Sequence, residues 1–301
     1  MAEQDRSWTP PEPYDLPRSL GVLGRGPHDP AYRRDADGTV WRATRTPCGP
    51  ATLRLVPGSR IRATAWGPGA AWVLDRLPEL LGATDDPDAF VPRHRLLAEV
   101  RRRHRGLRLV RTGLVLESLI PTVLEQKVTA QEAHRAWRML LRRHGDPAPG
   151  PVAGLFVMPE PRGWCRIPSW EWHRAGVDSK RSTAVLRAAR VAGRLEEAAR
   201  MPLPEATARL RLIPGVGPWT AAETLQRSNG AADAVTVGDL HLPGIVGYAL
   251  TGLRGADDTR MLELLEPYAG QRYRATRLIL LSGRIPARRT PGMPRWDIAR
   301  L

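Results

Sequence analysis

Apolar side chains alternate with basic or hydroxylic ones in three short runs near the start of the chain, residues 39–45, 51–56 and 60–66. A period of two is typical of strands that bury one face. Glycine and proline pairs separate the runs, as they do between antiparallel strands. The pattern then changes over residues 70–81, where apolar positions recur at helical spacing. We therefore expect an antiparallel sheet followed by a helix.

From about residue 91 onward the pattern is helical almost throughout. The expected helices cover residues 91–104, 112–128, 130–144, 179–200, 206–212, 219–226, 240–250, 258–265 and 272–282. Thr129 and Glu132 form a capping box at the start of one of them. The fold class is therefore predicted as α+β, an N-terminal antiparallel β-rich lobe followed by an all-α region. The expected division is a loose tail (1–14), a β-rich domain (15–90), a helical domain (91–284) and an irregular basic tail (285–301).

One turn between two of these helices carries features of a phosphate-binding site. Gly215 and Gly217 allow a close backbone approach to another chain. Pro218 fits the first turn of the next helix, whose free N–H groups attract anions without a basic side chain. An ordinary corner between two helices is the alternative interpretation. The residues expected to contact DNA here are Leu212, Pro214, Gly215, Val216, Gly217, Pro218 and Thr220.

Residues 212–221, Leu-Ile-Pro-Gly-Val-Gly-Pro-Trp-Thr-Ala, are followed by Val-Gly-Asp-Leu-His-Leu at 237–242. Together they resemble the helix-hairpin-helix DNA glycosylase superfamily, and within it the 3-methyladenine DNA glycosylase II family. The segment Ala-Trp-Gly-Pro-Gly-Ala at 65–70 resembles the N-terminal domain of the same family. The resemblance thus covers nearly the whole chain and implies a strand-rich lobe joined to a helix-hairpin-helix region.

The resemblance implies that Asp239 is the catalytic carboxylate. A carboxylate beside C1′ can stabilise an oxocarbenium-like transition state and orient water. Capping of the following helix is the structural alternative for Asp239, and the two roles are compatible. Bifunctional members of the superfamily carry a lysine just before Thr-Ala, where this chain has Trp219. We therefore expect water, not an amine, to attack the sugar.

The resemblance also implies a pocket for the flipped base, formed by Trp219, Glu223, Gln271 and Tyr273. An aromatic wall would favour a cationic base, although most of the ten tryptophans belong to the core by default. The family places its minor-groove wedge where this chain has Gln126 and Lys127. An exposed polar corner is the alternative for those two residues. Lys127 stands where the family would have an apolar wedge, and Glu223 and Gln271 stand at or near positions where it has aromatic residues. These departures from the family pattern leave the identity of the lesion open.

The composition agrees with a polyanionic partner. The formal net charge is +15, which is typical of proteins that bind nucleic acid. Only Cys48 and Cys165 occur, which excludes a disulfide framework, a zinc pattern and the iron–sulfur branch of the superfamily. We expect no cofactor and no catalytic metal. The resemblance implies a monovalent cation at the carbonyls of Leu212 and Gly217.

The sequence therefore predicts a monofunctional DNA glycosylase of base excision repair that removes alkylated bases from double-stranded DNA. Two alternatives stay open: a glycosylase for deaminated or oxidised bases, and a non-catalytic protein that binds damaged DNA. No apolar run is long enough for a membrane span, and no signal peptide is recognised. We expect a cytoplasmic monomer that acts at the nucleoid.

Overall fold

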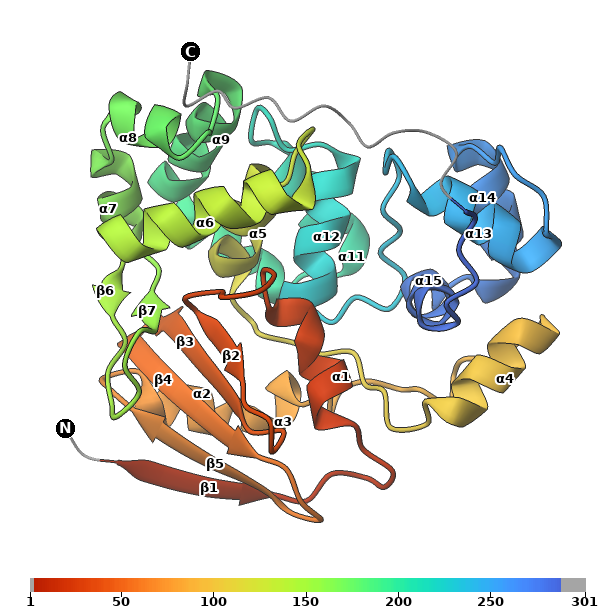
Figure 1. Cartoon of the computed structure of the whole chain (residues 1–301), viewed down its shortest axis with the longest axis horizontal. Helices are drawn as coiled ribbons and strands as arrows, with labels where there is room; N and C mark the ends of the chain where they lie inside the picture. The colour runs from red at the N-terminus through yellow and green to blue at the C-terminus, as the bar shows by residue number, and fades with distance from the viewer. Residues whose placement is uncertain (1–2, 288–301) are drawn as a thin grey trace.

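The computed structural model describes residues 3–287, and its N-terminal part is a five-stranded antiparallel sheet (Figure 1). The strands lie in the order β1-β5-β4-β3-β2, so β2 to β5 form a meander and β1 joins its β5 edge. Their bounds are β1 Gln4–Trp8, β2 Tyr32–Arg34, β3 Val40–Thr46, β4 Gly49–Val56 and β5 Ile61–Trp66. The α+β class and the antiparallel sheet predicted from the alternation are confirmed.

The loose N-terminal tail expected over residues 1–14 is wrong for β1, which pairs with β5 along its whole length. The side chains of β1 are mostly exposed and polar, so the strand shows no apolar alternation. Backbone hydrogen bonds to β5 hold it instead, together with the guanidinium of Arg6. That group donates to the carbonyl oxygens of Leu74 and Asp75, at 2.6 and 3.1 Å.

One face of the sheet packs against three short helices, α1 Leu16–Leu20, α2 Ala70–Asp75 and α3 Leu77–Leu80. The helix expected over residues 70–81 is therefore broken at Arg76. Pro78 has no N–H to donate to the carbonyl of Leu74, four residues earlier. Arg6 of β1 donates to that carbonyl instead.

The other face of the sheet is covered by a small hairpin from the helical part. This hairpin pairs β6 Asp146–Pro147 with β7 Phe156–Val157. Trp41 and Trp66 stack with their ring centroids 5.8 Å apart, and they pack against Leu155 and Val157. The hairpin thus buries the part of this face around Trp41 and Trp66 and attaches the sheet to the helices that follow.

The region expected as one helical domain contains two separate hydrophobic cores. The first is built around α5, whose residues are nearly all buried. The elements that contribute to it are α5 Val115–Leu124, α6 Ala130–His144, α7 Pro161–Arg166, α8 Ser169–Arg174, α9 Ser179–Arg190, α10 Ala192–Glu196, α11 Leu203–Arg211 and α12 Pro218–Ser228, with the 3₁₀ turn Glu197–Arg200.

The second core joins one helix near residue 100 to three helices from the last third of the described chain. Leu97 and Val100 of the first of these helices are buried against the others. The elements are α4 Arg95–Arg103, α13 Leu242–Thr251, α14 Asp258–Leu265 and α15 Arg272–Leu281, with the 3₁₀ turn Glu266–Tyr268. Figure 1 shows α13, α14 and α15 beside the first core, with α4 next to α15. Two cores meeting side by side create a boundary in which a site can lie.

Several expected helices end earlier or begin later than the apolar pattern suggested. α4 begins at Arg95 because Pro92 and the extended backbone of His94 delay it. The helix expected over residues 179–200 breaks at Val191 into α9, α10 and a 3₁₀ turn. Over residues 3–287, no helix combines the length and apolar character that a membrane crossing requires. The basic tail expected over 285–301 lies outside the described residues from 288 onward.

Candidate active site

The turn between α11 and α12 forms a tight hairpin. Gly215 has a φ of +103°, and a Cβ at this position would lie 2.9 Å from the Cβ of Ala184. Only glycine fits such a left-handed and crowded position without strain. The N–H of Val216 donates to the carbonyl of Ile213 at 2.9 Å, and both side chains are buried. No side chain caps α12, which starts after Gly217, so its first N–H groups lie at the tip of the hairpin.

A side chain from the corner between α5 and α6 braces this hairpin. The amide nitrogen of Gln126 donates to the carbonyl of Gly215 at 2.9 Å and to Oγ1 of Thr220 at 2.8 Å. Lys127 follows with a φ of +55° and an exposed side chain. A left-handed backbone is unusual for lysine and persists only where neighbours fix it. The corner is therefore rigidly attached to the hairpin and presents Lys127 beside it.

The hairpin carbonyls differ in their capacity to hold a cation. The carbonyl of Gly217 already accepts the N–H of Ala221 at 3.0 Å, within the first turn of α12. The carbonyl of Pro214 accepts from the guanidinium of Arg187 at 3.2 Å. Leu212 ends α11, where helix carbonyls lack intrahelical partners. The Leu212 carbonyl thus fits a monovalent cation better than that of Gly217 does.

Asp239 lies in the loop that leads into α13, and three N–H groups hold its carboxylate. Oδ1 accepts from the backbone N–H groups of His241 and Leu242, both at 2.8 Å. Oδ2 accepts from Nε1 of Trp219 at 3.0 Å. The preceding Gly238 has a φ of +87° and donates its N–H to Asp258 at 3.0 Å. Asp239 thus caps α13 and at the same time joins the two helical cores.

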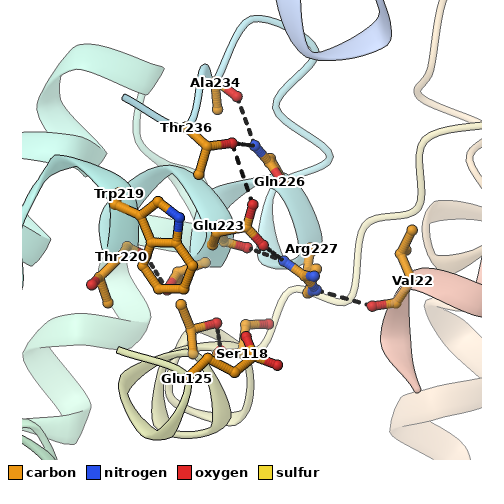
Figure 2. A network of polar contacts seen from close by, with 12 residues as sticks. Val22, Ser118, Glu125, Trp219, Thr220, Glu223, Gln226, Arg227, Ala234 and Thr236 are labelled. Atoms are coloured by element: carbon orange, nitrogen blue, oxygen red, sulfur yellow. Dashed lines mark hydrogen bonds and ion pairs between the residues drawn. The ribbon is translucent and has the colours of Figure 1, made fainter. Parts of the chain in front are cut away.

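Trp219 and Glu223 lie on the same face of α12, and Arg227 continues this row (Figure 2). Oε2 of Glu223 accepts from Nη1 of Arg227 at 2.7 Å. Oε1 of Glu223 accepts from the hydroxyl of Thr236 at 3.3 Å. Burial acts to lower the pKa of Arg227, but the carboxylates of Glu223 and Glu125 act together with other nearby groups to outweigh it, and the pKa is raised. The guanidinium therefore stays charged.

A second ion pair involves Glu125, whose side chain is labelled below Glu223 and Arg227 in Figure 2. Both carboxylate oxygens of Glu125 accept from Nη1 of Arg25 at 2.9 Å. Burial acts to raise the pKa of Glu125, but Arg25 and Arg227 outweigh it, and the pKa is lowered. The carboxylates of Glu125 and Glu223 thus each pair with a guanidinium group, and Arg227 acts on both carboxylates.

The two remaining candidates for the base pocket are placed differently. Tyr273 is buried at the start of α15, where its hydroxyl accepts from Nη1 of Arg277 at 3.4 Å and its backbone N–H donates to the carbonyl of Ala232 at 2.8 Å. Gln271 donates to the carbonyl of Asp86 at 3.5 Å and accepts from Nε of Arg274 at 2.8 Å. The structure therefore brings Trp219 to Asp239 and pairs Glu223 with Arg227, while Gln271 contacts a different segment.

Sequence reasoning missed Arg227, Thr236 and Asp258. The four-residue spacing from Trp219 through Glu223 to Arg227 was a usable signal, because such residues share a helix face. Thr236 and Asp258 reach the site only through the folded chain, so no local pattern identifies them. Residues 3–287 contain no group of three His, Cys, Asp or Glu side chains placed to hold a metal ion.

A cavity of about 40 Å³ lies between the sheet and α5, and its lining includes Tyr32, Glu117 and Arg227. The hydroxyl of Tyr32 is buried there without a hydrogen-bond partner, and burial raises its pKa to about 12. Neither Asp239 nor Trp219 lines this cavity. It is therefore distinct from the space beside Asp239.

No protein-family model and no curated protein matches this chain. The fold, however, matches solved structures. The 3-methyladenine DNA glycosylase of Archaeoglobus fulgidus aligns with a TM-score of 0.74 and 16% identity, over 92% of this chain and 98% of that one. An 8-oxoguanine glycosylase/lyase of Clostridium acetobutylicum, bound to double-stranded DNA containing cytosine opposite 8-oxoguanine, aligns with a TM-score of 0.71 and 12% identity, over 90% and 92%.

A smaller glycosylase matches the chain in part. The 3-methyladenine DNA glycosylase of Schizosaccharomyces pombe, in complex with abasic DNA, aligns with a TM-score of 0.51 and 21% identity. That alignment covers 61% of this chain and 87% of the other. The chain thus has the fold of helix-hairpin-helix DNA glycosylases, in the arrangement that includes the N-terminal sheet.

Proposed function

We propose that this protein is a monofunctional DNA glycosylase that removes a damaged base from double-stranded DNA and leaves an abasic site. The observation that carries the proposal is the carboxylate of Asp239. It is held by three N–H groups from two helical cores, beside a glycine hairpin, on a fold shared with solved DNA glycosylases.

The hairpin and the charge of the chain support binding to duplex DNA. The N–H groups at the start of α12 suit a phosphate. Apart from the two chain neighbours of Gly217, no atom of the described residues lies within 4 Å of where a Cβ of Gly217 would stand, so this point of the hairpin is open to approach. The net charge of +15 supplies a general attraction to the backbone of DNA. A base stacked inside a duplex cannot reach Asp239, so the nucleotide must be flipped out first.

Asp239 would then act on the sugar of the flipped nucleotide. As the base leaves, positive charge develops at C1′, and a fixed carboxylate lowers the energy of that transition state. Oδ2 accepts only the Trp219 N–H among residues 3–287 and so keeps a lone pair for the attacking water. Oδ1 accepts two backbone N–H groups, which prevents the carboxylate from rotating away.

Water is the nucleophile in this proposal because α12 offers no amine. The chain has two lysines, Lys127 and Lys180, and neither lies on α12. Trp219 occupies the position before Thr220 and donates to Asp239 instead. The DNA strand should therefore stay intact after the base is released.

Alkylated purines are the substrate class that we propose. Methylation at N3 or N7 gives the purine a positive charge, which makes it a good leaving group. One fixed carboxylate is then sufficient for hydrolysis. The half-buried indole of Trp219 lies beside Asp239, and its electron-rich face suits a cationic base.

The test is the release of free bases from duplex DNA treated with dimethyl sulfate, compared with duplexes that contain 8-oxoguanine or uracil. We expect methylated purines to be released and abasic sites to accumulate without strand breaks. If the protein releases 8-oxoguanine or uracil but no methylated purine, its substrates are oxidised or deaminated bases and the proposed class of alkylated purines is wrong. Binding to all the duplexes with no base release from any would overturn the glycosylase function.

A further inference from the structure

Three side chains form a row along α12 that starts at the candidate catalytic carboxylate. Trp219, Glu223 and Arg227 are four residues apart, so they share one face of the helix and follow one another at steps of about 6 Å. The first of them donates to Asp239. A base whose sugar lies at Asp239 and whose ring extends along this face would present its far edge to the other two.

Glu223 and Arg227 are fixed from several directions (Figure 2). Nη1 of Arg227 donates to the carboxylate and to the backbone carbonyl of Glu223, both at 2.7 Å. Nε of Arg227 donates to the carbonyl of Val22 at 2.9 Å, which ties α12 to the N-terminal lobe. The hydroxyl of Thr236 donates to Glu223 from the loop that carries Asp239. The pair therefore has one defined geometry.

The pair retains unused hydrogen-bonding capacity. Within residues 3–287, Nη2 of Arg227 has no hydrogen-bond partner, while Nε and Nη1 are occupied. Each carboxylate oxygen of Glu223 accepts one side-chain hydrogen bond and can accept another. The two side chains keep 18% and 15% of their surface exposed, so the pair borders accessible space. An acceptor and a donor thus lie side by side.

We propose that Glu223 and Arg227 read the Watson–Crick edge of a flipped purine, an inference that rests on the proposed glycosylase function. The carboxylate accepts from an N–H of the base, and the guanidinium donates to the neighbouring ring nitrogen or carbonyl oxygen. Purines methylated at N3 or N7 keep such a donor beside an acceptor, and so does hypoxanthine. In 1,N6-ethenoadenine the added ring removes the N6–H donors and blocks N1.

Recognition by this edge differs from attraction of a cation by a free carboxylate. The guanidinium of Arg227 neutralises Glu223, so the pair has no net charge with which to select a positive base. The edge contact therefore does not depend on the charge of the base, while the positive charge of a methylated purine makes it the better leaving group. A site built for hydrogen bonding rejects a base that leaves its donor and acceptor unpaired.

The experiment compares three duplexes under single-turnover conditions: one treated with dimethyl sulfate, one with hypoxanthine and one with 1,N6-ethenoadenine. The variant is Glu223→Gln, which keeps the size of the side chain and removes its charge. The matched control is Glu99→Gln, because Glu99 forms an exposed ion pair with Arg95 four residues apart on α4. Arg227→Lys is a second variant, which keeps the positive charge and loses the planar guanidinium group with its fixed N–H donors. Thermal unfolding shows whether each variant folds.

The wild-type protein should release methylated purines and hypoxanthine much faster than ethenoadenine. Glu223→Gln should slow the release of the first two about 10- to 100-fold, the range for a lost hydrogen bond to a charged group. Arg227→Lys should slow the same two, and Glu99→Gln should leave all rates unchanged. The ratio of hypoxanthine to ethenoadenine release should therefore fall in both site variants.

An equal loss for all three duplexes would assign the pair a structural role and overturn the inference, while the glycosylase function would stand. Ethenoadenine released as fast as hypoxanthine by the wild-type protein would also overturn it. If Glu223→Gln does not fold, the ratio measured with Arg227→Lys decides. No release from any of the three duplexes by the wild-type protein would overturn the proposed function itself.

Discussion

Replacing Trp219 with phenylalanine removes one hydrogen bond from Asp239 and keeps an aromatic ring at the site. In the structure Nε1 of Trp219 donates to Oδ2 of Asp239 at 3.0 Å. A hydrogen bond to a charged acceptor contributes about 1.5–3 kcal/mol. Both side chains are partly exposed, and water can replace part of the contact, so we expect a loss of about 1–2 kcal/mol. If the loss falls on the transition state, base release slows by about 5- to 30-fold.

The assay is single-turnover release of methylated purines from dimethyl-sulfate-treated duplex DNA. Trp170→Phe is the matched control, because that tryptophan is 68% exposed on α8, which contributes to the first core. The control should release bases at the wild-type rate. A Trp219→Phe protein that also releases bases at the wild-type rate would refute the argument that this N–H positions the carboxylate.

Three further outcomes follow from the hairpin and from the positive charge of the chain. Gly215→Ala should lower the thermal unfolding temperature and weaken DNA binding, because φ is +103° and the new Cβ would lie 2.9 Å from the Cβ of Ala184. An unchanged affinity for DNA would contradict the role of this hairpin geometry in binding. Gln126→Ala should lower the free energy of unfolding by about 1–2 kcal/mol in a urea titration, since it removes two hydrogen bonds within the protein of about 0.5–1 kcal/mol each, and unchanged stability would contradict the bracing of the hairpin. Affinity for undamaged duplex should fall steeply between 50 and 200 mM salt, as expected when several phosphates are contacted, to about a thousandth or less; a flat response would contradict phosphate binding.

The parts of the fold with a clear periodic pattern could be predicted from the sequence. The runs that form β3, β4 and β5 alternate apolar with basic or hydroxylic residues, and α12 follows a recognisable glycine turn. β1 could not be predicted in this way, because backbone pairing and Arg6 hold a polar segment at the edge. The division of the helices into two cores also escaped prediction, since α4 packs against α15, which is far away in sequence.

The candidate site was predictable where chemistry is local and unpredictable where it depends on distant segments. Asp239 and the hairpin lie in short motifs, so their residues were identified directly. The contact between Trp219 and Asp239 required the structure, because it forms between two helices of different cores. The resemblance to the family placed Gln271 in the base pocket, whereas in the structure its side chain bonds to Asp86 and Arg274. The four-residue spacing between Glu223 and Arg227 was compatible with an ion pair, but only the structure shows that the two side chains are paired.

The central claim is that the carboxylate of Asp239 drives base release, and Asp239→Asn tests it most directly. Asparagine can still cap α13, so the variant should unfold at nearly the wild-type temperature. Asp257→Asn is the control, because Asp257 is exposed and caps α14 by accepting the backbone N–H of Arg260 at 2.9 Å. We predict that Asp239→Asn binds methylated duplex but releases its purines at least about 100-fold more slowly, the typical cost of losing fixed electrostatic stabilisation. Release at the wild-type rate by a folded Asp239→Asn protein would contradict the account.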